Sequence, residues 1–166
     1  MTTIYLSLGS NMGNRAENIV RAIAALGRRG VRVTEESSLY ETEPLEIREQ
    51  PWFLNCAIAA ETELSPEGLM EMLLEIEREM GRERIVPKGP RLIDMDILLY
   101  GEDVVREPGL EIPHARMAER KFVLVPLAEI AGETTHPVAM MTIAELLEAT
   151  ADRSEVRKWP DKMRAG

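Results

Sequence analysis

Residues 31–63, VRVTEESSLYETEPLEIREQPWFLNCAIAAETE, contain two β-rich segments that are joined without a helix. The first runs from Val31 to about Thr42, and the second from about Phe53 to Glu63. The connection, residues 43–51, holds two prolines and predicts a loop. Successive parallel strands would need a crossover, usually a helix, between them, so this stretch favours an antiparallel sheet.

A helix and a strand are expected on each side of this stretch. Alternating apolar residues predict strands over residues 3–8 and 91–100. Helix starts are predicted at Asn14, with Glu17 three residues later, and at Ser65-Pro66. The resulting order, strand-helix-strand-strand-helix-strand, is the split βαβ pattern. It predicts an α+β fold, a ferredoxin-like split βαβ sandwich: an antiparallel sheet with helices on one face, the other face free, and extra C-terminal elements.

The C-terminal part of the sequence predicts shorter elements. Residues 101–103, Gly-Glu-Asp, are typical of a hairpin turn, here into Val104-Val105. A short helical piece and an apolar run over residues 122–130 follow, and Thr142 starts a last helix in capping-box spacing. The stretch from Asp152 is polar and is expected to fray.

Composition restricts the class of protein. With 166 residues, 45% of them apolar, the chain suits a single domain over residues 1–166 with a real hydrophobic core. The single cysteine, Cys56, excludes an intrachain disulfide framework and is interpreted as a small core residue. The net charge of −9 argues against a general nucleic-acid binder, since phosphate contacts need a basic face. No apolar run approaches the ~20 residues that span a bilayer and no export signal is visible, so a cytoplasmic protein is expected.

Two acidic residues distinguish the strand over residues 91–100. Asp94 and Asp96 share one face, whereas the apolar residues at positions 93, 95, 97 and 99 share the other. Two residues advance about 6.6 Å along a strand, so both carboxylates can reach one cation or a cation pair. Two neighbouring carboxylates without a partner repel each other, and a divalent cation removes this repulsion. Oxygen ligands without a nearby histidine favour Mg²⁺ over zinc as that cation. The alternative to a metal site is that Asp94 and Asp96 simply lie on a solvated face of the sheet, near lysines or arginines.

A basic segment precedes this strand. Five cations lie within fourteen residues of an otherwise acidic chain: Arg78, Arg82, Arg84, Lys88 and Arg91. Arg82 and Arg91 can clamp a polyphosphate whose magnesium ions sit on the carboxylates. Ordinary salt bridges on the helix surface are the alternative for Arg78.

Aromatic residues are few, and the two phenylalanines, Phe53 and Phe122, both follow polar or proline-containing loops. Rings in such places can sandwich a planar heterocycle, although core packing is the alternative. Asn55, two residues after Phe53, is expected on the same strand face, where its amide can meet the edge of that heterocycle. His114 is either structural or a donor to phosphate, and His136 is interpreted as structural.

Together these residues resemble the hydroxymethyl-dihydropterin pyrophosphokinase family of folate biosynthesis. The resemblance extends from Leu8 to about Ala131. Its most specific motif is the G-P-R-x-x-D-x-D segment over residues 89–96. The other matching segments are Leu8-Gly9-Ser10-Asn11, Tyr40-Glu41-Thr42, Gln50-Pro51-Trp52-Phe53-Leu54-Asn55, Gly81-Arg82-Glu83-Arg84, Ile112-Pro113-His114 and Arg120-Lys121-Phe122-Val123-Leu124.

The resemblance implies transfer of an intact pyrophosphoryl group from ATP to the hydroxymethyl oxygen of a reduced pterin, with release of AMP. It implies two Mg²⁺ ions on Asp94 and Asp96, with Arg82 and Arg91 stabilising the charge of the transferring group. ATP and the reduced pterin are the expected partners, with no nucleic acid, no membrane and no obligatory protein partner. The further ATP-side positions implied are Arg84, Ile97, His114 and Arg120. The pterin positions implied are Thr42, Leu45, Phe53, Asn55 and Phe122.

Three positions depart from the residues common in the family. Lys88 stands where tryptophan is common, Glu43 where proline is frequent, and Ala115 where an aromatic residue often follows the histidine. Two other functions are left open by the residues alone: a non-catalytic ferredoxin-like binding module, and a metal-dependent nucleotidyltransferase acting on nucleic acid. The first predicts that the basic segment is only salt-bridged, and the acidic balance argues against the second.

Overall fold

The structure, a computed structural model, describes residues 1–44, 49–81 and 91–160. Its main sheet has six strands within these ranges, and all its strand pairs are antiparallel. These strands are β1 (Thr2–Ser10), β2 (Val31–Glu36), β3 (Tyr40–Thr42), β4 (Phe53–Thr62), β5 (Asp94–Tyr100) and β8 (Val156–Lys158). A separate hairpin pairs β6 (Val105–Glu107) with β7 (Leu110–Ile112). The helices are α1 (Arg15–Gly27), α2 (Pro66–Glu79), α3 (Lys121–Ala131) and α4 (Ile143–Ala149), with a 3-10 turn at Met117–Glu119.

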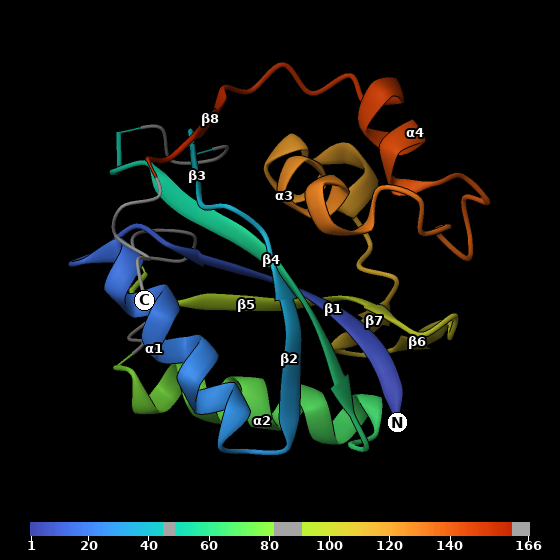
Figure 1. Cartoon of the computed structure of the whole chain (residues 1–166), viewed down its shortest axis with the longest axis horizontal. Helices are drawn as coiled ribbons and strands as arrows, with labels where there is room; N and C mark the ends of the chain where they lie inside the picture. The colour runs from blue at the N-terminus through green and yellow to red at the C-terminus, as the bar shows by residue number, and fades with distance from the viewer. Residues whose placement is uncertain (45–48, 82–90, 161–166) are drawn as a thin grey trace.

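The strand order is that of the predicted split βαβ fold. Strand β1 lies between β5 and β4, and β2 and β3 both pair with the other edge of β4. Strands β1 and β2 therefore run parallel with β4 between them, and α1 makes the connection. Helices α1 and α2 lie together on one face of the sheet (Figure 1). The expected α+β class with an antiparallel sheet is confirmed.

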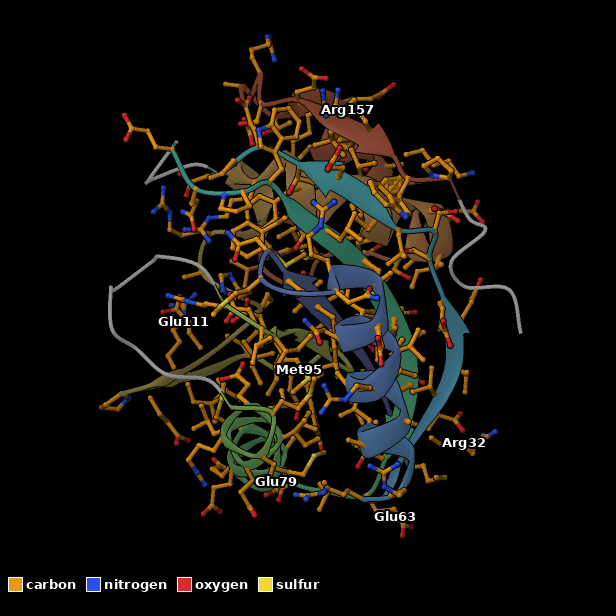
Figure 2. All side chains as sticks on the ribbon, turned by 90° about the vertical axis from the view of Figure 1, so that its left-hand side faces the viewer. Arg32, Glu63, Glu79, Met95, Glu111 and Arg157 are labelled. Atoms are coloured by element: carbon orange, nitrogen blue, oxygen red, sulfur yellow. The ribbon has the colours of Figure 1, made fainter. Side chains whose placement is uncertain are left out.

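Local signals begin the helices where the sequence predicts. Asn14 caps α1 and Ser65 caps α2, each accepting a hydrogen bond from the backbone N–H three residues later. A capping box at Thr142 begins α4. The apolar sides of α1 and α2 pack on the sheet to form the main core, in which Met95 of β5 is 4% exposed and lies in the interior in Figure 2.

The opposite face of the sheet is not left free, contrary to the expectation. Helix α3 covers part of it, and α4 packs against α3 (Figure 1). A second apolar cluster fills this contact, formed by Ala57, Leu98, Leu99, Met117, Val123, Leu124, Leu127, Ala131, Ile143 and Leu146. Because α3 is apolar over most of its length, burying it against the sheet is favourable.

The alternation of side chains in β5 breaks at its C-terminal end. Ile97 packs in the core under α1 and α2 as expected, but Leu99 packs in the cluster under α3. The pairing of β5 with β1 shifts register between Tyr5 and Leu6, and such a shift turns the following side chains to the other face. The two aspartates precede this shift, so they keep the face that the sequence predicts.

Two predictions about the C-terminal part are wrong. Residues 101–103 form a turn, but β6 pairs with β7 and not back onto β5. The stretch from Asp152 is not a frayed tail as far as residue 160, because β8 pairs with β3 and satisfies the backbone groups of that strand's outer edge. Asp152 itself accepts a hydrogen bond from the backbone N–H of Lys121 at 2.8 Å, which fastens this stretch to the start of α3.

Candidate active site

A pocket lies on the sheet face that α3 covers only in part. Strands β1, β4 and β5 contribute to it, together with the end of β3 and the start of α3. Its walls combine aromatic, amide, acidic and basic side chains from distant parts of the chain. The predicted site residues that line it are Thr42, Phe53, Asn55, Arg91, Asp94, Asp96, Arg120 and Phe122.

Asp94 and Asp96 both line the pocket, as the alternation predicts. Their side chains are 29% and 48% exposed, so a ligand can reach both carboxylates. The Nη1 atom of Arg91 lies 3.3 Å from Oδ2 of Asp94, and Nε2 of His114 lies 4.0 Å from Oδ1 of Asp96. Burial, and then the charge of Arg120, lower the pKa of His114 below its usual 6.5, so the imidazole is neutral at pH 7.

Arg120 contributes a positive charge to the pocket. Its guanidinium has no carboxylate partner in the described part of the chain. Its Nε atom is buried and makes no hydrogen bond with any residue that the structure describes. Its guanidinium carbon lies 5.8 Å from the centroid of the Phe122 ring. A buried N–H donor on a guanidinium that has no carboxylate partner among the described residues suits an anionic ligand, because such a ligand would satisfy both the donor and the charge.

A buried hydrogen bond on the core side of the sheet fixes the strand that carries the two aspartates. Met95, which lies between them, points into the core, and its backbone N–H donates to Oε2 of Glu77 at 2.8 Å. Glu77 lies on α2 and is 2% exposed. This contact ties the start of β5 to α2, so the carboxylates project from a fixed strand. The sequence analysis missed Glu77, which has no distinguishing signal on an acidic helix.

Asn11 connects three segments around the pocket. Its side-chain nitrogen donates to Oε1 of Gln50 at 2.8 Å and to the carbonyl oxygen of Pro51 at 3.0 Å. Its Oδ1 accepts a hydrogen bond from the backbone N–H of Arg91 at 2.7 Å. The turn after β1 therefore positions both the segment before Phe53 and the residue that contacts Asp94. The only sequence signal for this role is the Gly-Ser-Asn motif.

The aromatic wall of the pocket carries a fixed amide. The Nδ2 atom of Asn55 donates to Oγ1 of Thr42 at 2.6 Å, and both residues are buried. Phe53 and Phe122 are partly exposed and reach the same pocket from β4 and α3. Two rings beside an oriented amide can hold a planar heterocycle with a polar edge.

Not every predicted site residue lies in the pocket. Ile97 is 2% exposed in the main core, on the other face of the sheet. His114 contacts Asp96 without lining the pocket. Leu45, Arg82, Arg84 and Lys88 lie outside the described residues.

The pocket also contains residues that the sequence analysis did not assign to it: Ser7, Gly9, Glu43, Pro44 and Gln50. The carboxylate of Glu43 accepts a hydrogen bond from the backbone N–H of Glu155 at 2.8 Å, so this departure from the family's common proline is tied to the C-terminal stretch. Ala115, another departure, is exposed. None of the helices in the described ranges has the length and apolar character that crossing a bilayer requires.

Comparisons with known proteins agree with this chemistry. Residues 5–132 match the family described as 7,8-dihydro-6-hydroxymethylpterin-pyrophosphokinase (HPPK). The 2-amino-4-hydroxy-6-hydroxymethyldihydropteridine pyrophosphokinase of Bacillus subtilis is 42% identical over 95% of this chain and 90% of its own length. The Haemophilus influenzae protein of the same name is 38% identical over 96% of this chain and 100% of its own length. The folic acid synthesis protein fol1 of Pneumocystis carinii is 44% identical over 90% of this chain, which spans only 20% of that longer protein.

A solved structure supports the fold. The crystal structure of wild-type Plasmodium falciparum HPPK-DHPS with STZ-DHP matches 89% of this chain and 43% of its own chain, with a TM-score of 0.72 and 16% identity. At that identity the likeness concerns the fold alone, and it confirms the ferredoxin-like class. The family match and the relatives named as pyrophosphokinases support an enzyme in place of a non-catalytic module. The chain belongs to the 7,8-dihydro-6-hydroxymethylpterin-pyrophosphokinase family.

Proposed function

We propose that this pocket binds ATP with two Mg²⁺ ions beside a reduced pterin and transfers the pyrophosphoryl group between them. One observation carries the proposal: the aromatic and amide wall shares a single pocket with Asp94, Asp96 and two arginines. A planar heterocycle needs the first set of groups and a polyphosphate needs the second. Their proximity supports a site in which the two substrates would bind next to each other.

Asp94 and Asp96 are the proposed magnesium ligands. Among the described residues, no group of three or more His, Cys, Asp or Glu side chains could hold a metal ion by itself. Mg²⁺ commonly takes one or two protein carboxylates and completes its coordination with water and substrate phosphates. Two partly exposed carboxylates on one strand fit an ion that arrives with the nucleotide. When bound, Mg²⁺ would neutralise the charge on the phosphate oxygens.

The proposed reaction moves the β- and γ-phosphates as one unit. The hydroxymethyl oxygen forms a bond to the β-phosphorus, the bond from that phosphorus to the α,β-bridging oxygen breaks, and AMP leaves with this oxygen. Arg91 and Arg120 would donate hydrogen bonds to the phosphate oxygens as their charge redistributes. The rings of Phe53 and Phe122 would hold the pterin with its hydroxymethyl group toward the phosphates. Asp96 is the proposed acceptor of the hydroxyl proton.

None of the remaining predicted positions is a described residue that lines the pocket. Arg82, Arg84 and Leu45 keep the roles that the family resemblance implies. His114 is proposed on the ATP side because it contacts Asp96. Any contribution from Ile97 would come from its backbone, since its side chain is buried in the core.

The test compares Asp94→Asn and Asp96→Asn with Asp103→Asn, an exposed aspartate in the turn after β5. The first two variants should form AMP at least about 100-fold more slowly, as expected when a preorganised charge is lost. They should also lose the magnesium-dependent rise in Tm that a non-hydrolysable ATP analogue produces in the unaltered protein, while Asp103→Asn behaves normally. A magnesium-dependent rise that survives in both variants, or ADP as the product, would contradict the proposal.

A further inference from the structure

We infer that Gly9 is a positioning residue for the pterin, because its missing side chain leaves the space that the amide oxygen of Asn55 occupies. The inference rests on the proposed role of Asn55 at the pterin. In the sheet register, Gly9 of β1 lies between Asn55 of β4 and Asp94 of β5. Paired residues of antiparallel strands direct their side chains to the same face at close distance. A side chain at residue 9 would therefore enter the pocket between its amide and its acidic wall.

The backbone at Gly9 does not itself require glycine. The glycines with positive φ in the described ranges are Gly13, Gly30, Gly81, Gly101 and Gly109. Gly9 instead continues a regular strand, whose conformation any L-residue adopts. Glycine in the interior of a strand weakens the strand and is commonly found where another group approaches closely. The requirement at residue 9 is thus for space.

Asn55 fills this space. A Cβ atom at Gly9 would lie 2.3 Å from Oδ1 and 3.4 Å from Cγ of Asn55. The first distance is far shorter than a non-bonded contact allows, so the amide would have to move. The next neighbour, Cδ1 of Phe53, would be 3.5 Å away, which is an ordinary contact. The three nearest atoms include none from Asp94.

The other end of the same amide is anchored. The Nδ2 atom of Asn55 donates to Oγ1 of Thr42 at 2.6 Å. A methyl group at Gly9 would therefore either rotate the oxygen about this anchor or break the hydrogen bond to Thr42. Both movements change the acceptor that the pterin edge meets, and neither disturbs the carboxylates. Gly9 should thus control pterin binding and leave nucleotide binding unaffected.

A double-mutant cycle tests this inference, with the KM for each substrate measured from AMP formation. Gly9→Ala should raise the KM for the pterin about 10- to 100-fold, the range expected for one lost buried hydrogen bond. The KM for ATP should stay within about twofold. In Gly9→Ala/Asn55→Ala the Oδ1 and Cγ atoms of residue 55 are absent, so the new methyl group at residue 9 no longer clashes with them. The pterin KM of this double variant should therefore stay within about twofold of that of Asn55→Ala alone. Gly27→Ala is the matched control, since a Cβ there meets nothing within 4 Å.

The outcomes separate this inference from the proposed function. If Asn55→Ala weakens pterin binding and Gly9→Ala does not, or if Gly9→Ala multiplies the KM equally in both backgrounds, the inference is overturned while the pterin site stands. If Asn55→Ala itself leaves the KM for the pterin unchanged, the proposed pterin site fails first. If Gly9→Ala does not fold, recovery of its circular dichroism in the double variant supports the clash, and failure of the double variant to fold overturns it.

Discussion

Replacing Arg120 by methionine should stabilise the ligand-free protein and weaken its binding of ATP. The Nε atom of Arg120 is buried without a hydrogen-bond partner in the described ranges, and the side chain lines the pocket. After burial, the charge of Arg120 is the largest influence that lowers the pKa of His114, so this charge acts on the site even without ligand. Methionine keeps an unbranched chain beside Phe122 and removes both the charge and the donors.

The expected magnitudes follow from the buried donor of Arg120. A buried polar group without a partner costs about 1–3 kcal/mol, and the lower value applies here because the residue is only partly buried. For a protein of this size, about 1 kcal/mol corresponds to a Tm higher by about 2–4 °C. Hydrogen bonds to charged groups contribute about 1.5–3 kcal/mol, so ATP should bind about 10- to 150-fold more weakly.

Calorimetry of the ligand-free protein and titration with a non-hydrolysable ATP analogue and magnesium measure the two effects of Arg120→Met separately. Arg116→Met is the control, because Arg116 is exposed on the same segment and its Nη2 atom lies 4.0 Å from Oε1 of Glu119. It should change neither quantity appreciably. If Arg120→Met lowers the Tm and leaves the affinity for the analogue unchanged, Arg120 is a structural residue and the reasoning is refuted.

Three further predictions concern groups outside the pocket. Burial raises the pKa of the Cys56 thiol to about 12, so at pH 8 a thiol reagent should modify the protein only after unfolding in urea, as measured by mass spectrometry. Burial lowers the pKa of His136, whose Nδ1 accepts hydrogen bonds from two backbone N–H groups of the following turn. The neutral ring therefore stabilises the folded protein above pH 6.5, the usual pKa of histidine, and this stability is lost as the pH falls through the lower pKa of the folded state. His136→Asn keeps an acceptor at this place, and its free energy of unfolding in urea should depend less on pH below 6.5. Tyr40→Phe removes a hydrogen bond of 2.6 Å to Oε1 of Glu129 and should lower the free energy of unfolding by about 1 kcal/mol. Tyr5→Phe should change it little, since no described residue bonds the hydroxyl of Tyr5.

The sequence predicted the elements whose boundaries depend on neighbouring residues. Asn14 and Ser65 begin helices because their side chains accept from backbone N–H groups three residues away, which requires no tertiary contact. The alternation around Asp94 and Asp96 placed both carboxylates correctly for the same reason. The antiparallel pairing in the main sheet was predictable because the connection between β3 and β4 is too short to contain a crossover helix.

The failures concern pairings between residues that are distant in the chain. The polarity of the C-terminal stretch predicts fraying, yet Val156 pairs with Thr42 because β3 offers an open edge. Leu99 lies on the unexpected face because of a register shift opposite β1. In the site, the roles of Gly9 and Asn11 depend on Asn55 and on Arg91, which a local pattern does not reveal.

The division of one sheet face between core and site explains why the pocket has its composition. Under α3, β1 and β5 direct apolar side chains into the second cluster, whereas beyond the start of α3 the same strands present Ser7, Gly9 and the two aspartates. Ser7 and Gly9, two small residues of β1, leave space in the pocket between β4 and β5, so the carboxylates of β5 and the amide of Asn55 on β4 can contact the same ligand. Since these groups project from strands rather than from loops, their spacing is set by the sheet before any substrate binds. A side chain added on this stretch of β1 should therefore impair binding without unfolding the sheet. Among the glycines that the structure describes, Gly9 leaves the least room for a Cβ atom.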